Sequence, residues 1–263
     1  MSDRNWIRVQ RDARGVVTVT LDNAAKLNVL NPPIMTDLIT AMRRLAGEPT
    51  LRAVVLTGAG QRAFIGGADI EAMATLDAGT ARGFITLVHQ SCEVVRCMPV
   101  PVIARIQGWA LGAGLEIAAS CDFRIASSDA RVGMPEVRVG IPSVVEAALL
   151  PGLIGWGRTR RLLLTGETID AATALDWGMV EEVVPPGELD TAVERAIDGI
   201  LASGPRAVRL QKALIADWEG SSLETAIQCG IDRFVDAWVT DEPQRMMRTF
   251  MTRRRATDKP ATP

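Results

Sequence analysis

The spacing of apolar positions predicts alternating strands and helices over the first half of the chain. Two β-rich stretches, residues 6–11 and 16–21, flank the turn Asp12-Ala13-Arg14-Gly15 and predict a hairpin. Apolar residues at helical spacing after Asn31-Pro32-Pro33 predict a helix to about residue 46, and another is expected at about 79–97. Short strands are expected at 51–56, 100–106, 123–126 and 131–133, with a short buried helix at 112–120. The repeated order of strand, strand and helix predicts an α/β core.

The last third of the chain has a different pattern of apolar positions from the first half. Beyond residue 144 the pattern is rich in helices, with one strand expected at 180–184. Helices are expected at about 188–203, 205–218, 222–239 and 242–254, followed by a frayed tail at 256–263. We therefore expect a core of strand-strand-helix turns at 1–195 and a helical region at 196–263, and we expect this helical region to dock on the core or on another subunit.

Composition narrows the class of protein. The 263 residues carry 29 basic and 31 acidic side chains, so no global field attracts nucleic acid or an anionic membrane. The first residues lack the apolar core of a signal peptide, and no charge-free apolar run reaches the ~18 residues of a membrane span. Four cysteines without Cys-x-x-Cys spacing indicate reduced, buried thiols, with no disulfide framework and no metal site. We expect a soluble cytoplasmic protein.

Histidine is nearly absent, which restricts the possible chemistry. His89 is the single histidine, and it falls inside the helix expected at 79–97. A Ser-His-Asp or Cys-His mechanism would have to use this imidazole, and a surface or packing role is favoured for it instead. Catalytic groups are therefore sought among the carboxylates.

A glycine motif after the third expected strand could indicate either a dinucleotide-binding turn or a plain turn. Gly58-Ala59-Gly60-Gln61-Arg62-Ala63 has the form G-x-G-x-x-A, which is typical of dinucleotide-binding turns. Such a turn leads directly into a helix, whereas here Phe64-Ile65-Gly66-Gly67 intervenes. We interpret the motif as a plain turn.

Three later segments are better candidates for a site. The first, residues 63–70, contains Gly66-Gly67 and then Asp69, which can start a helix. The second, residues 107–116, places three glycines before an apolar helix that contains Glu116, one turn from Ala113. Main-chain amides before a helix can donate to an anionic oxygen, and a carboxylate in an apolar helix is costly unless it is bonded or functional. The third segment carries Glu136 between apolar neighbours.

Taken together, these segments resemble those of the crotonase (enoyl-CoA hydratase/isomerase) superfamily over nearly the whole chain. The resemblance implies a spiral of ββα turns with a C-terminal helical trimerisation layer. It implies an oxyanion hole from the amides of Ala68 and Ala113, and acid/base roles for Glu116 and Glu136. It also implies that substrate and CoA contact a further set of residues: Ala25, Lys26, Leu27, Gly67, Ala68, Asp69, Ile70, Gly112, Ala113, Phe250 and Arg253.

The chain departs from the family pattern at two places. Where many of these hydratases have a turn resembling I-P-G-x-G-G, this chain has Ile141-Pro142-Ser143-Val144-Val145-Glu146. Glu146 is either a third catalytic group or, as we favour, an early-helix glutamate stabilised by the helix dipole. Glu71 occupies a position where the family often has lysine. Trp109 either lines the acyl pocket or packs, and the basic run 253–255 either closes over CoA or is a solvated tail.

The expected activity is hydration of a 2-enoyl-CoA, with Glu116 deprotonating water and Glu136 protonating C2. The substrate is an acyl-CoA thioester, no separate cofactor is expected, and a homotrimer or a dimer of trimers is implied. Isomerisation, hydrolysis or decarboxylation of an acyl-CoA stays open, as does a non-catalytic CoA-binding or scaffold protein. Acyl selectivity is expected to depend on residues 75–88 and 143–147.

Overall fold

The computed structural model describes residues 6–257, and their side chains as far as Thr252. The chain divides into two compact units, Met1–Ile197 and Asp198–Pro263. The boundary expected at 195/196 falls beside this division, inside the helix α7 (Leu189–Leu201).

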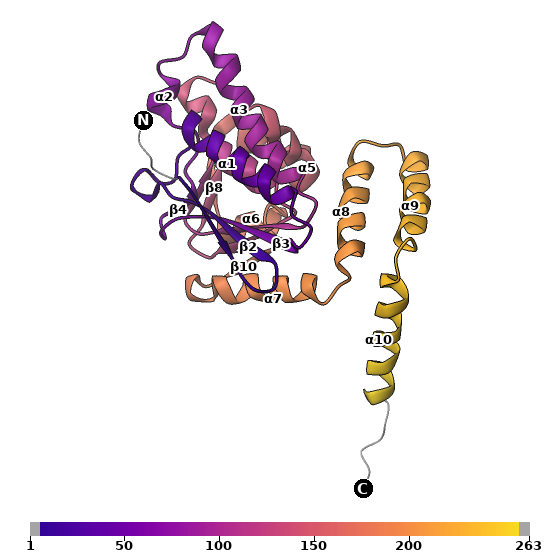
Figure 1. The fold of residues 1–263 in the computed structure, drawn as a ribbon. Helices are drawn as coiled ribbons and strands as arrows, with labels where there is room; N and C mark the ends of the chain where they lie inside the picture. Colours follow the sequence, from indigo (N-terminus) through magenta and orange to yellow (C-terminus); the bar gives the residue numbers. More distant parts are fainter. Residues whose placement is uncertain (1–5, 258–263) are drawn as a thin grey trace. The chain divides into compact units, whose positions relative to one another are not determined.

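The first unit is built on a six-stranded sheet whose four central strands are almost fully buried (Figure 1). The hairpin at its edge pairs antiparallel, and every other neighbouring pair is parallel. In spatial order the strands are β1 (Ile7–Arg11), β2 (Val16–Leu21), β3 (Ala53–Gly58), β5 (Val102–Ile106), β7 (Phe123–Ser127) and β10 (Glu182–Val184). Continuous Val, Ile and Leu runs are typical of parallel strands covered on both faces.

A second sheet contains four strands of three residues each. They are β4 (Ala63–Ile65), β6 (Trp109–Leu111), β8 (Arg131–Gly133) and β9 (Thr168–Asp170). The first three are parallel neighbours, and β9 adds antiparallel to β8. Because β4, β6 and β8 follow β3, β5 and β7 in the chain, each long strand passes into a short one, and the short strands end at one edge.

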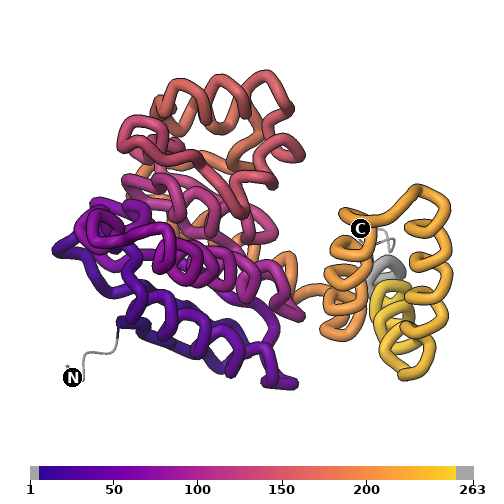
Figure 2. Tube along the Cα trace, turned by 90° about the horizontal axis from the view of Figure 1, so that it is seen from above, coloured from indigo at the N-terminus to yellow at the C-terminus, as the bar shows by residue number. Residues whose placement is uncertain are grey.

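Helices complete the turns of this arrangement, as Figures 1 and 2 show. Helix α1 (Pro32–Ala46) begins where the Asn31 side chain accepts from the Ile34 amide, and it packs against α3 (Ala78–Arg96). Asp77 and Thr80 form a capping box at the start of α3. The short helix α4 (Ala113–Ala119) is buried along its whole length and follows β6 directly. The other α-helices of this unit before α7 are α2 (Ile70–Met73), α5 (Leu150–Thr165) and α6 (Ala171–Trp177).

The second unit is helical. Helices α8 (Pro205–Glu219) and α9 (Leu223–Ala237) pack as an antiparallel hairpin, followed by α10 (Glu242–Thr257). Glu242 ties α10 to α8 because its carboxylate accepts from the main-chain amides of Arg206 and Ala207. Within residues 6–257, no helix has the length and apolarity that crossing a membrane requires.

The α/β class and the C-terminal helices are confirmed, and three details were wrong. The sequence missed the three-residue strands β4, β6 and β9, each of which pairs with a segment distant in the chain. The expected tail began too early, since α10 includes Ala256 and Thr257. All four cysteines are free thiols, but Cys97 is exposed and Cys229 half-buried, so only Cys92 and Cys121 are buried as expected.

Candidate active site

Two glycine-marked turns lie side by side where β4 and β6 end. Gly67 has φ +109° and Gly112 has φ +50°, conformations that L side chains rarely adopt. A Cβ added to Gly67 would approach the Leu111 carbonyl oxygen to 3.1 Å. One on Gly114 would lie 2.1 Å from the Ile65 carbonyl oxygen, closer than real Cβ atoms come. Glycine is therefore required for α4 to start this close to β4.

The residues after these glycines carry unused main-chain donors. Leu30 donates to Gly67 and accepts from Asp69, so the intervening Ala68 amide points elsewhere. Ala113 is the first residue of α4, where amides have no acceptor within the helix. Neither amide donates to any group in the described part of the chain, and both residues line the same cavity. This arrangement fits the predicted oxyanion hole.

Glu116 lies one turn into α4 and is 4% exposed. Its Oε1 accepts from the Ala147 amide at 3.0 Å. Burial raises the pKa of this carboxyl to about 8, the Ala147 amide opposes that rise, and the negative charges of Glu136 and Glu146 add to it. Glu116 therefore retains a proton in conditions where an exposed glutamate is ionised.

Glu136 belongs to the 3₁₀ segment η2 (Pro135–Val139), which follows β8. The Ser143 hydroxyl donates to its Oε2 at 2.8 Å. Its Oε1 lies directly over Gly112, at 2.2 Å from where a Cβ would stand. Burial raises the pKa of Glu136, and the Ser143 hydrogen bond works against this rise. The carboxyl group is thus held beside the turn that presents the Ala113 amide.

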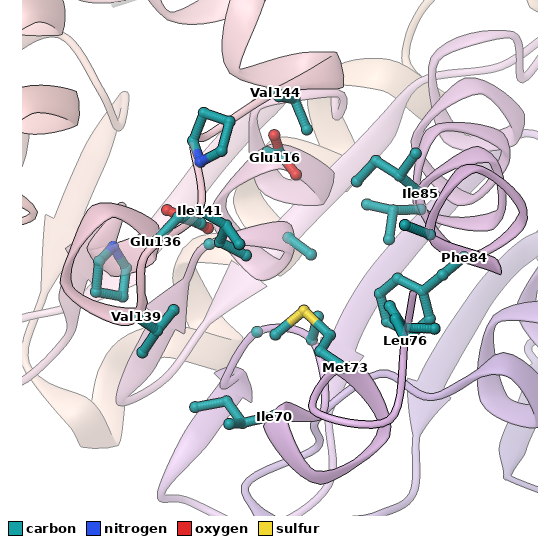
Figure 3. A pocket seen from close by; sticks show the side chains of 18 of the residues that line it. Ile70, Met73, Leu76, Phe84, Ile85, Glu116, Glu136, Val139, Ile141 and Val144 are labelled. Carbon is teal, nitrogen blue, oxygen red and sulfur yellow. The ribbon is translucent and has the colours of Figure 1, made fainter. Parts of the chain in front are cut away.

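Both glutamates and both alanines line one cavity of about 890 Å³ (Figure 3). Its wall is mainly apolar and comes from α2 (Ile70–Met73), α3, η2 and the following loop. The apolar side chains include Ile70, Met73, Leu76, Phe84, Ile85, Val88, Val139, Ile141 and Val144. Arg82 and Arg138 supply positive charge, which the sequence did not single out. Residues 76–88 and Val144 fall in the ranges expected to shape the acyl site, whereas Trp109 is not part of the wall.

The remaining predicted binding residues have different positions. The turn Ala25-Lys26-Leu27 lies beside the first glycine segment, because the Gly66 amide donates to the Leu27 carbonyl. Lys26 Nζ lies 2.7 Å from Glu71 Oε2, so the glutamate found in place of a lysine is paired with this neighbouring lysine. Asp69 caps α2 by accepting from the amides of Glu71 and Ala72, and it does not line the cavity.

Two predicted contacts belong to the second unit. Phe250 is exposed on α10. The side chain of Arg253 lies outside those that the structure describes. Their roles in CoA binding stay predictions.

Several residues that build the site were not found from the sequence. Ser143 and Ala147 hold the two glutamates. Ser143 lies in the segment in which the family's glycines are replaced, and Ala147 follows it directly. Val145 in that segment has φ +40°, an outlier for a β-branched residue. Glu146 lies in the first turn of a 3₁₀ helix, η3 (Val145–Leu149), as expected of an early-helix glutamate, but it is buried and pairs with His89. The departure from the glycine pattern drew attention to Glu146, but nothing in the sequence indicated its pairing with His89.

Replacing Glu116 by glutamine is expected to stabilise the fold at alkaline pH. Its folded-state pKa is about 8, above the ordinary value of 4.5, so its contribution to stability is complete below about pH 4.5 and is lost as pH rises to about 8. Glutamine does not ionise and still accepts from Ala147. Melting temperatures of both proteins should therefore be close at pH 5 and separate in favour of the variant by pH 9, corresponding to a few kcal/mol. Equal differences at both pH values would contradict the raised pKa.

The fold and the site define a class of proteins that bring two main-chain amides and two carboxyl groups together on one apolar cavity. Comparison with known proteins identifies it: a sequence model for Enoyl-CoA hydratase/isomerase matches residues 11–259. The chain belongs to this family and has its crotonase-type fold.

The relatives match over nearly their full length. The chain is 36% identical to a crotonyl-CoA hydratase of Syntrophomonas wolfei, with 97% of this chain and 98% of the relative covered. It is 34% identical to a short-chain-enoyl-CoA hydratase of Clostridium acetobutylicum, with 91% and 92% covered. The crystal structure of an enoyl-CoA hydratase from Bacillus anthracis superposes with a TM-score of 0.91 at 32% identity, covering 95% of this chain and 97% of that one.

Proposed function

We propose that the protein is an enoyl-CoA hydratase that adds water across the C2=C3 bond of a 2-enoyl-CoA thioester to give a 3-hydroxyacyl-CoA. The observation that carries this proposal is the convergence of Glu116, Glu136 and the free amides of Ala68 and Ala113 on one apolar cavity. The family membership and the two hydratases at 34–36% identity support it. Coenzyme A enters as part of the substrate, and the reaction needs no separate cofactor.

The two amides act on the charge that forms during the reaction. As water adds at C3, negative charge moves onto the thioester oxygen and produces an enolate. Donors already aimed at this oxygen need no reorganisation, and one such donor contributes about 3 kcal/mol to transition-state stability. Because the positions of both amides are fixed by main-chain turns, the hole is preorganised before substrate arrives.

The two carboxyl groups manage the protons of one water molecule. One group takes a proton from water as the other gives a proton to C2. The active form of the pair therefore has one carboxyl group protonated and the other ionised. In this proposal Glu116 orients and deprotonates the water and Glu136 protonates C2. Burial favours the resting proton on Glu116, and the two groups are electrostatically coupled, so the pair titrates as a unit. Before water adds, this proton passes to Glu136, which leaves Glu116 as the base and Glu136 as the acid. When Glu116 then takes a proton from water and Glu136 gives its proton to C2, the pair returns to its resting state.

The test is direct hydration by the purified protein. Loss of the ultraviolet absorbance of the conjugated thioester is followed with short, branched and long 2-enoyl-CoAs, and the product is identified by mass, since hydration adds one water. An isomerase would change the position of the double bond without changing the mass. Absence of turnover on all these thioesters would exclude the proposed reaction.

We expect kcat/KM to show a bell-shaped dependence on pH. Activity requires one proton on the pair, so it falls at high pH when that proton is lost, with the upper limb near the Glu116 pKa of about 8. It falls at low pH when both groups are protonated and no base remains. Steady-state rates over pH 5 to 10 measure both limbs, and in the Glu116→Gln variant the limb near 8 should be absent from the residual activity.

We also propose that the protein assembles as a homotrimer or a dimer of trimers. Helix α9 exposes a row of large apolar side chains, which single subunits rarely leave in water: Leu223, Ile227, Ile231, Phe234 and Val235. Light scattering should give a mass of three or six times the 28.3 kDa chain. A monomer at micromolar concentration would contradict this expectation.

A further inference from the structure

The turn formed by residues 143–147 contacts both glutamates and lines the cavity with one side chain, although it lacks glycine. Ser143 donates to Glu136, Val144 lines the wall, and the Ala147 amide donates to Glu116. Val145 is held at φ +40°, where a β-branched side chain is strained. Strain of this kind persists only where surrounding contacts fix the backbone. Contacts outside the turn must therefore hold Val145 in this conformation.

Glu146 provides the anchor. It is 5% exposed, and its Oε1 lies 2.7 Å from Nδ1 of His89 on α3. Its Oε2 is also buried and accepts no hydrogen bond within the described residues. Burying a carboxylate with an unpartnered oxygen costs free energy, so we expect Glu146 to serve a purpose other than stability. Glu146 is absent from the cavity wall, so that purpose is not contact with substrate.

The peptide that follows Glu146 connects it to the acid/base pair. The Ala147 amide donates both to the Val144 carbonyl at 2.9 Å and to Glu116 Oε1 at 3.0 Å. A contact that fixes Glu146 therefore also fixes the direction of this amide. Since His89 belongs to α3, the contact ties the turn to a helix that forms the opposite part of the cavity wall.

The electrostatic surroundings agree with this arrangement. The titratable groups facing Glu146 in the described structure are His89 and Cys92 of α3 and Glu116 of α4. Burial raises the pKa of the Cys92 thiol, and the charges of Glu146 and Glu116 raise it further, so the thiol stays neutral. The negative charge of Glu146 raises the pKa of Glu116 in the same way, next to the effect of Glu136.

We propose that His89 and Glu146 form a positioning pair, which holds the 143–147 turn so that the Ala147 amide orients Glu116 in the reacting arrangement. The proposal rests on the hydratase function, in which Glu116 handles the water. His89 is thereby a functional residue although it does not touch the substrate.

The kinetic test compares variants of the pair. His89→Leu and Glu146→Leu should each lower kcat about tenfold or more through misplacement of Glu116, with KM changed less than about twofold. The double variant should be no worse than either single one, because both remove the same link. His89→Asn, whose amide can donate from the position of Nδ1, should recover most of the loss. Glu93→Gln changes an exposed charge one turn further along α3 and should leave kcat unchanged.

The pH profile separates positioning from mere folding. Glu146→Gln keeps the shape and the hydrogen-bond acceptor but removes a negative charge near Glu116. Its upper limb should therefore shift to lower pH than in wild type, whereas Glu93→Gln should leave the limb in place. Additive losses in the double variant, losses confined to KM, or an unmoved limb would overturn the proposal.

A second measurement does not depend on catalysis. Because His89 is the one histidine, ¹⁵N spectra of untagged protein report its ring nitrogens directly. The pair requires a proton on Nδ1 donated to Glu146, and Glu146→Leu should release this tautomer. Hydrogen exchange of the peptide covering residues 144–150 should quicken in the same variant but not in Glu93→Gln. If wild type hydrates no enoyl-CoA, the hydratase proposal fails by itself, and unchanged spectra and exchange would separately refute the pair.

Discussion

Replacing Glu136 by glutamine is expected to lower kcat for hydration roughly 10³-fold, the middle of the range for a removed general acid or base. Glutamine keeps the volume and an acceptor for Ser143 but cannot deliver a proton to C2. KM should change little, because the apolar wall and the two amides that hold the thioester remain. The ultraviolet assay on the best enoyl-CoA of the series, with Glu93→Gln as the control, measures the effect.

The companion variant Glu116→Gln distinguishes hydration from simpler proton transfer. Hydration needs both carboxyl groups, so this variant should lose a similar factor. An isomerase needs one proton shuttle, and Glu136 alone can act as one. Activity that survives Glu116→Gln but is lost in Glu136→Gln would therefore replace the hydratase proposal with the one-base reaction.

Gly112→Ala is expected to reduce kcat by about two orders of magnitude without unfolding the protein. The added methyl group would stand 2.2 Å from Glu136 Oε1, so the carboxyl group must move, and φ +50° is strained for alanine. The turn that aims the Ala113 amide is disturbed at the same time, and a displaced donor in the hole alone accounts for a factor of about 10².

A matched glycine keeps this prediction specific. Gly152 has nothing within 4 Å of an added Cβ and its φ is ordinary, so Gly152→Ala should leave kcat unchanged. Melting curves should show Gly112→Ala folded at the assay temperature. Full activity in a folded Gly112→Ala protein would show that neither Glu136 nor the Ala113 amide needs this turn.

The sequence predicted those parts of the molecule that depend on local patterns. The hairpin of β1 and β2, the capped helix α1 and the buried helix α4 each follow from periodicity and end signals in their own residues. Only the family resemblance predicted that four residues converge on one site: Ala68, Ala113, Glu116 and Glu136. Local patterns do not predict which turns lie close together in space.

The unpredicted parts are long-range contacts or very short elements. The strands β4, β6 and β9 exist because each pairs with a neighbour far along the chain. The pairing of His89 with Glu146 joins residues 57 positions apart, and neither residue alone indicates it. The sequence did locate the unusual segment 143–146, but the left-handed conformation of Val145 is opposed by its own side chain and arises from the surrounding structure.

The use of main-chain amides at Ala68 and Ala113 has a consequence for how this protein can change. Ordinary substitutions at these two positions alter a side chain and leave the N–H in place, so only proline deletes a donor outright. Substitution of the carboxyl groups, by contrast, changes the proton chemistry and leaves the donors untouched. In the proposed hydratase, enolate stabilisation and proton handling therefore reside in separate parts of the site, and single substitutions at the carboxylates are expected to change the proton chemistry on an unaltered backbone.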